Sequence, residues 1–136
     1  MIYFNGELRT DEAVFEFQDR IRLGDGVFDT MLVIDGDMMH TNSHFERLID
    51  NAKMLHFSNI PNIDDLKNAA HTLLESFESL NGRFALNTLI TRGLAERGLA
   101  PSENAKPNIA MRLSPVPKAF PPIHAMISET VRRNEG

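Results

Sequence analysis

The stretch Leu23-Gly24-Asp25-Gly26-Val27-Phe28-Asp29-Thr30-Met31-Leu32-Val33-Ile34 joins a turn to a strand. Gly24-Asp25-Gly26 opens the apolar run 27–34, which ends at a second turn, Asp35-Gly36-Asp37, before Met38. Glycine next to aspartate is typical of tight turns between strands, so the stretch predicts a hairpin. No helix follows the glycines, and the turn therefore does not match the dinucleotide-binding fingerprint, in which a helix N-terminus receives a pyrophosphate.

Other parts of the chain also predict strands. Residues 3–9 indicate a short hairpin, because Asn5-Gly6 supplies the positive φ angles that a tight turn needs. From Arg83 to Ile90 the side chains alternate with a period of two, and Thr91-Arg92-Gly93 closes this strand. Two further strands are expected, at 108–113 and 124–131. The proline-rich segments beside them predict loops or edges, because proline cannot donate to a sheet ladder; these are residues 101–107 and 114–122.

Two amphipathic helices are expected in the middle of the chain. Apolar residues recur every three or four positions from Phe45 to Leu55, after the cap-forming residues Thr41-Asn42-Ser43. The same spacing returns from Leu66 to Phe77 after Pro61-Asn62, and this helix is expected to end by 81–82. Hairpins, two helices and then strands predict an α+β fold, a two-layer sandwich of mostly antiparallel sheet with two helices on one face.

Composition limits the classes of protein to consider. The 136 residues suit one domain, and 42% hydrophobic with 24% charged residues is ordinary for a globular chain. No apolar run approaches the ~20 residues of a membrane helix, so no membrane partner is expected. No secretory signal is visible and cysteine is absent, which makes the cytoplasm the expected location. A net charge of −5 argues against nucleic-acid binding.

His44 and Arg47 are the first candidate site residues. They lie three positions apart, so on a helix they point the same general way. Arg47 lies roughly 140° from the centre of the apolar stripe, and this position taken alone favours a solvated arginine. Met54 shares that side of the helix, which suggests that something covers the flank.

The stretch 91–98 is the second candidate, because Arg92 and Arg97 flank a short loop. A surface loop in which Glu96 pairs with either arginine is the simpler interpretation. The remaining histidines lack a partner at metal-ligand spacing, so no metal site is expected and they are interpreted as structural or exposed; they are His40, His56, His71 and His124. Asp25 and Asp29 have no acid-base partner that spacing identifies, and Ser43 is interpreted as a helix cap.

Three stretches in this order resemble the N-terminal domain of the fold-type IV (class IV) aminotransferases, which are pyridoxal-phosphate enzymes. They are 23–30, then His44-Phe45-Glu46-Arg47-Leu48, then Thr91-Arg92-Gly93-Leu94-Ala95-Glu96-Arg97-Gly98. The family includes branched-chain aminotransferase, D-amino acid aminotransferase and aminodeoxychorismate lyase. The resemblance implies that Arg47 contacts the phosphate of pyridoxal 5'-phosphate. It also implies that Phe28, His44 and Arg97 bind the substrate, with Arg97 reaching a carboxylate across a homodimer. Leu99 stands where one relative has histidine.

The resemblance also implies that residues 1–131 form the small domain and that 132–136 begin the linker to a lysine-bearing large domain that this sequence lacks. The lysines present do not match the position of the family's Schiff-base lysine; they include Lys53, Lys67, Lys106 and Lys118. No catalytic residue is therefore expected in this chain, and the isolated chain is expected to be inactive.

As part of a full-length enzyme, the resemblance implies amino transfer between a small amino acid, expected to be of the branched-chain type, and a 2-oxo acid. One alternative is aminodeoxychorismate lyase, a pyridoxal-phosphate enzyme that supplies 4-aminobenzoate for folate synthesis. The other alternative is a non-catalytic module that dimerises or holds a small anion through Arg47 and Arg97.

Overall fold

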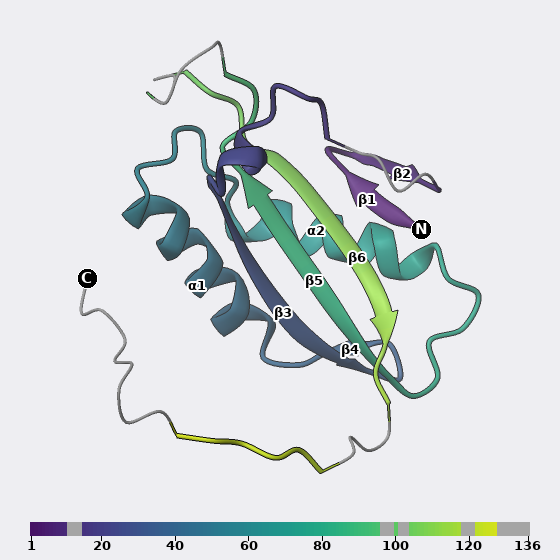
Figure 1. Ribbon diagram of the computed structural model, residues 1–136. Coiled ribbons are helices and arrows are strands. Elements are labelled where there is room, and N and C mark those ends of the chain that lie inside the picture. Colours follow the sequence, from purple (N-terminus) through teal and green to yellow (C-terminus); the bar gives the residue numbers. More distant parts are fainter. Residues whose placement is uncertain (11–14, 96–99, 101–103, 118–121, 128–136) are drawn as a thin grey trace.

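The computed structural model describes residues 1–10, 15–95, 100, 104–117 and 122–127. Two α-helices, α1 (Thr41–Met54) and α2 (Ile63–Glu75), and a short 3-10 helix, η1 (Arg20–Leu23), accompany a six-stranded sheet (Figure 1). The strands are β1 (Ile2–Phe4), β2 (Glu7–Arg9), β3 (Gly26–Ile34), β4 (Asp37–Met38), β5 (Arg83–Thr91) and β6 (Asn108–Pro115).

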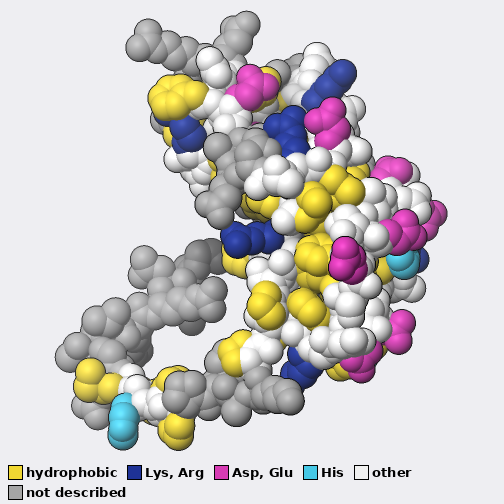
Figure 2. Space-filling view, turned by 90° about the vertical axis from the view of Figure 1, so that its right-hand side faces the viewer, with side chains coloured by type: hydrophobic (Ala, Val, Ile, Leu, Met, Phe, Trp, Pro, Cys, Tyr) yellow, Lys and Arg dark blue, Asp and Glu magenta, His cyan; other side chains and the backbone are white. Residues whose placement is uncertain are grey.

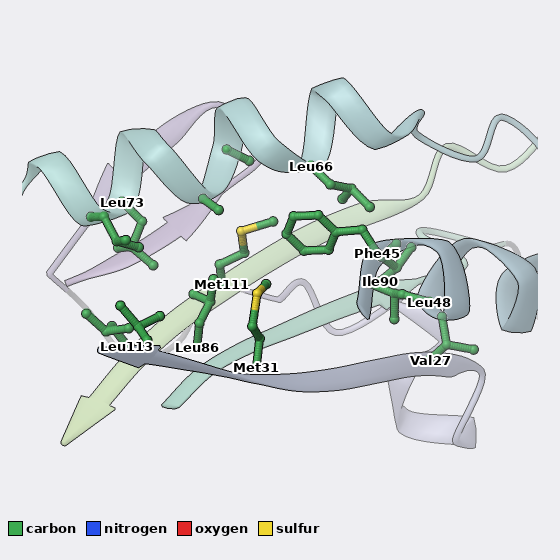
Figure 3. Packing of buried hydrophobic residues seen from close by; sticks show 14 of the residues in the cluster. Val27, Met31, Phe45, Leu48, Leu66, Leu73, Leu86, Ile90, Met111 and Leu113 are labelled. Carbon is green, nitrogen blue, oxygen red and sulfur yellow. The ribbon is translucent and has the colours of Figure 1, made fainter. Parts of the chain in front are cut away.

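The sheet has the strand order β2-β1-β6-β5-β3-β4, and every neighbouring pair is antiparallel. Helix α1 packs on β3, whereas α2 packs on β6 and β1, so both helices cover the same face of the sheet (Figures 1 and 3). This arrangement confirms the predicted α+β sandwich with two helices on one face.

The core lies between the helices and the sheet. Strand residues alternate between faces, so Val27, Met31 and Val33 of β3 point toward the helices and are buried. Phe45 of α1 lies in the centre of the apolar layer (Figure 3). A fully buried leucine or phenylalanine contributes about 1.5–3 kcal/mol, which makes this layer the main source of stability. Outside it, acidic side chains gather along one side of the molecule (Figure 2).

Both predicted hairpins form through two-residue turns with positive φ angles. Asn5 and Gly6 have φ values of 48° and 96°, and Asp35 and Gly36 have values of 49° and 90°. Two consecutive positive φ angles match the right-handed twist of the flanking strands, which explains why Asn-Gly and Asp-Gly sequences mark these turns.

The helix ends differ in part from the prediction. Helix α1 begins at Thr41, so Ser43 lies inside the helix, and its N-cap is His40 at φ 53° without a side-chain cap. The prediction of a cap at 41–43 was therefore wrong. Helix α2 has a capping box between Asn62 and Asp65, as Pro61-Asn62 suggested, and it ends at Glu75, which agrees with the expectation that it ends by 81–82.

The strand expected at 124–131 is not found in its described part. Residues 122–127 have no regular secondary structure, and Ile123, Met126 and Ile127 are each at least 85% exposed. Residues 128–131 lie outside the described residues. In the described ranges, neither helix reaches the length and hydrophobicity that crossing a bilayer requires.

Gly93 follows β5 at a close approach between two backbone segments. Its φ is 91°, and a Cβ built there would lie 1.9 Å from the carbonyl oxygen of Lys106. We expect Gly93→Ala to lower the free energy of unfolding by roughly 3 kcal/mol or more, because backbone strain and a backbone collision add. Urea unfolding followed by circular dichroism measures this loss.

Gly82→Ala is the matched control. Gly82 has a similar φ of 101°, but nothing lies within 4 Å of the position that a Cβ atom would take there. It should cost only the backbone strain of about 1–2 kcal/mol. Equal losses for the two variants would show that the contact with Lys106 has no energetic importance.

Candidate functional site

Asp29, His44 and Arg47 form a polar cluster between β3 and α1. Asp29 occupies a helix-facing position of β3, and its side chain is only 5% exposed. Its Oδ1 atom lies 2.6 Å from Nδ1 of His44, and its Oδ2 atom accepts a hydrogen bond from Nε of Arg47 at 2.8 Å and forms an ion pair with Nη2 at 2.6 Å. The predicted pair His44 and Arg47 is therefore confirmed to share one side of α1, and a carboxylate joins them.

The geometry determines which ring nitrogen of His44 carries a proton toward Asp29. An ionised carboxylate can only accept hydrogen bonds, so at 2.6 Å the Nδ1 atom is the donor. The contact of 3.2 Å between Nδ1 and Nη2 of Arg47 then joins two donors and is not a hydrogen bond. In a neutral ring, Nε2 is left as the acceptor.

Arg47 keeps hydrogen-bonding capacity for a further anion. Its side chain is 61% exposed, and Nη1 has no partner within the described part of the chain. A guanidinium presents five N–H donors in one plane, so an arginine that is held at Nε and Nη2 can still donate from its outer edge. The donor set therefore fits a phosphate or carboxylate. Met54 on the same flank is 76% exposed, and no described residue covers it.

Phe28 lies apart from this cluster. Neighbouring strand residues point to opposite faces, so Phe28 points away from the face that carries Asp29, and the residue is 70% exposed. It lines an open depression of about 340 Å³ beside α1, together with Gly26, Asn51 and Met54. Arg97 lies outside the described residues, so the structure describes two of the three predicted substrate-binding residues, Phe28 and His44.

A second cluster joins the glycine-rich turn to the end of β5. Oδ2 of Asp25 accepts hydrogen bonds from Nε of Arg20 at 2.6 Å and from Nε of Arg92 at 2.8 Å, and both arginine side chains are 8% exposed. Arg92 also donates to the carbonyl oxygens of Leu55 and His56 after α1. Arg92 is therefore a buried structural residue and not part of a surface loop, whereas Glu96 and Arg97 lie outside the described residues.

The two arginines determine the ionisation of Asp25. Partial burial raises the pKa of this carboxyl, but hydrogen bonds from Arg92 and Arg20, together with their charges, outweigh burial and lower the pKa below its ordinary value of 3.8. Asp25 is thus ionised at neutral pH and balances the buried guanidinium groups.

Sequence reasoning missed the partners of both aspartates. Asp25 and Arg92 are 67 positions apart, and Asp29 and Arg47 are 18 apart. One signal was available for Asp29, because it occupies a core-facing position in the alternation of Val27, Met31 and Val33. A buried carboxylate needs a cationic partner, so that position predicts one nearby.

Comparisons with known proteins agree with the motif pattern. Residues 26–136 match the family model described as Amino-transferase class IV. A protein of Methanocaldococcus jannaschii, provisionally named a branched-chain-amino-acid aminotransferase, is 33% identical over 119 residues, which cover 85% of this chain and 40% of that protein. The D-alanine aminotransferase of Staphylococcus haemolyticus is 29% identical over 111 residues, which cover 79% of this chain and 39% of that protein. The chain spans about two fifths of the length of these relatives.

Solved structures share the fold. The branched-chain amino acid aminotransferase of Escherichia coli gives a TM-score of 0.74 at 23% identity, over 85% of this chain and 39% of that one. The 4-amino-4-deoxychorismate lyase of Pseudomonas aeruginosa gives a TM-score of 0.72 at 23% identity, over 89% of this chain and 42% of that one. A hypothetical aminotransferase of Mycobacterium tuberculosis, solved in a PLP-bound form, gives a TM-score of 0.67 at 25% identity, over 86% of this chain and 40% of that one.

The Asp25 cluster predicts an acid-sensitive contribution to stability. We expect Asp25→Asn to lower the free energy of unfolding at neutral pH by roughly 3 kcal/mol, because two buried guanidinium groups lose their carboxylate. The folded-state pKa of Asp25 is depressed, so its stabilisation is present above the unfolded value of 3.8 and is lost as pH falls through the folded-state pKa. The difference between wild type and variant should therefore shrink below about pH 4.

Urea unfolding at several pH values measures this difference. Asp50→Asn is the control, because Asp50 pairs with Lys53 at the surface, where such a pair contributes less than about 1 kcal/mol. A pH-independent difference for Asp25→Asn would contradict the assignment.

Proposed function

Because this chain belongs to the class IV aminotransferase family, we propose that it supplies the phosphate-binding small domain of a pyridoxal-phosphate enzyme that moves amino groups. The observation that carries the proposal is the Asp29–Arg47 pair, which leaves the outer edge of an exposed guanidinium ready for an anion. The PLP-bound relative from Mycobacterium tuberculosis supports the choice of cofactor. The reaction of the whole enzyme is part of the proposal, because the chain spans two fifths of its relatives.

Each proposed residue has a distinct task. Arg47 binds phosphate oxygens with Nη1 and the outer N–H of Nη2, an arrangement in which two parallel hydrogen bonds fix both distance and orientation. His44 offers Nε2 to a polar group of the substrate, and Phe28 offers apolar surface to its side chain. Arg97 binds the substrate carboxylate, a role that rests on its place in the motif at 91–98. Bound pyridoxal phosphate would supply an electron sink for bonds broken at the amino acid's α-carbon.

We further propose a small, branched-chain-type amino acid and a 2-oxo acid as substrates, and a homodimer as the assembly. The relative from Methanocaldococcus jannaschii supports the substrate class. The likeness to the lyase from Pseudomonas aeruginosa, at 23% identity, concerns the fold and does not favour either reaction.

A substrate panel tests the reaction directly. The polypeptide as it occurs in its source cells is assayed with branched-chain amino acids and 2-oxo acids, and separately with 4-amino-4-deoxychorismate. We expect amino transfer with the first set. Turnover of 4-amino-4-deoxychorismate alone would contradict the transaminase proposal in favour of the lyase.

Phosphate binding by Arg47 predicts a ligand preference. Pyridoxine 5'-phosphate and pyridoxine differ only in the phosphate, and neither has an aldehyde that could react with surface lysines. We expect the chain to bind the phosphorylated compound at least about tenfold more tightly in NMR titrations. Arg47→Gln should reduce the preference by about 10- to 100-fold, because a hydrogen bond to a charged group contributes about 1.5–3 kcal/mol.

Lys53→Gln is the control for this experiment. It removes one positive charge from the same helix, six positions after Arg47, where Lys53 forms an exposed ion pair with Asp50. The preference for phosphate should be unchanged in this variant. Equal binding of the two compounds by the wild type, or equal losses in the two variants, would refute phosphate binding at Arg47.

A further inference from the structure

We propose that Asp29 is a positioning residue that holds the guanidinium of Arg47 in the orientation that binds phosphate. The inference rests on the proposed function, because it assigns Asp29 a part in the same site. Asp29 acts through Arg47 and does not contact the ligand.

Asp29 is itself held firmly in place, which makes this role feasible. It lies in the middle of β3, where it pairs with Thr88 of β5 across the sheet, and its side chain is 5% exposed. Its two oxygens are engaged by different side chains of the cluster, Oδ1 by His44 and Oδ2 by Arg47. A carboxylate held in this way cannot rotate without losing a charge-assisted hydrogen bond.

Arg47 needs such a partner because its long side chain is exposed. An arginine with 61% of its side chain in solvent samples many rotamers, and a ligand must select one of them. The hydrogen bond from Nε and the ion pair at Nη2 restrict the guanidinium before the ligand arrives. Such preorganisation strengthens binding by lowering the entropy lost on association.

Charge alone predicts the opposite effect. The negative charge of Asp29 lies 2.6 Å from the guanidinium of Arg47 and offsets its positive charge, so a purely electrostatic account expects weaker anion binding when Asp29 is present. Replacing Asp29 with asparagine therefore separates the two accounts. Asparagine has one acceptor oxygen, so it cannot accept from both His44 and Arg47 on separate oxygens.

Asp29→Asn is tested with pyridoxine 5'-phosphate and pyridoxine. We expect the preference for the phosphorylated compound to fall about tenfold, although the variant gains one unit of positive charge. Thr88→Val is the matched control, because the Thr88 hydroxyl is buried opposite Asp29 without a hydrogen-bond partner in the described residues. It should keep the wild-type preference. An unchanged or increased preference in Asp29→Asn would overturn the proposal.

The double variant Asp29→Asn/Arg47→Gln tests whether Asp29 acts through Arg47. If it does, the double variant matches Arg47→Gln, since there is no guanidinium left to orient. An additional loss of preference in the double variant would show that Asp29 does not act through Arg47 alone and would contradict the proposal. If wild type shows no preference for phosphate, or Arg47→Gln retains it, the proposed function fails too. If Arg47→Gln loses the preference and Asp29→Asn keeps it, only the role of Asp29 is refuted.

A measurement on the wild type covers the case in which Asp29→Asn does not fold. In an NMR titration with pyridoxine 5'-phosphate, the Nη resonances of Arg47 should shift while its Nε–H resonance stays in place, because Asp29 keeps that bond. Movement of the Nε–H resonance to the value of a solvated arginine would show that phosphate replaces Asp29, and would overturn the proposal.

Discussion

The ion pair between Asp25 and Arg92 is the interaction on which the geometry of this domain depends. It joins the turn before β3 to the residue after β5, and Arg92 extends the connection to the carbonyl oxygens of Leu55 and His56 at the end of α1. Three elements thus meet at one buried point. The guanidinium also lies over the ring of Phe57, 4.3 Å from its centre, so the contact is enclosed by apolar surface.

This attachment determines where the candidate site forms. Asp29 is four residues from Asp25 along β3, and His44 and Arg47 lie on the helix whose far end Arg92 holds. Helix α1 also packs directly on β3, and this packing together with the attachment at one end fixes the separation of the two elements. The distances between Asp29, His44 and Arg47 are therefore consequences of packing elsewhere. Arg92 is buried and stabilises the fold, whereas Arg47 is exposed and has N–H donors left for a ligand. A sequence motif alone does not show which of its arginines has which role.

The sequence predicted the elements that depend on local patterns. Asn5-Gly6 and Asp35-Gly36 formed the expected turns, and the apolar spacing in α1 and α2 located both helices. The cap of α1 was missed because His40, in a left-handed conformation, occupies the N-cap position without a side-chain hydrogen bond, so no cap-forming residue marks the start of the helix. At 124–127, apolar and β-branched residues suggested a strand, but pattern alone does not supply a neighbouring strand to pair with. The ion pairs of Asp25 with Arg92 and of Asp29 with Arg47 escaped prediction because these partners are 67 and 18 positions away, and proximity in space follows only from the fold.

The strand order also has a consequence for the time course of folding during synthesis. The hairpin of β1 and β2 is made first, yet its inner strand pairs with β6, where the Asn5 side chain donates a hydrogen bond to Asn108 across 103 positions. Until the ribosome has produced β6, the strands β1 and β5 each lack the neighbour on that side. Sheet completion therefore waits for the last described strand, and contacts that span so much of a chain make folding slow. The N-terminal hairpin spends that interval with an open edge, which makes it the segment with the longest exposure to wrong partners.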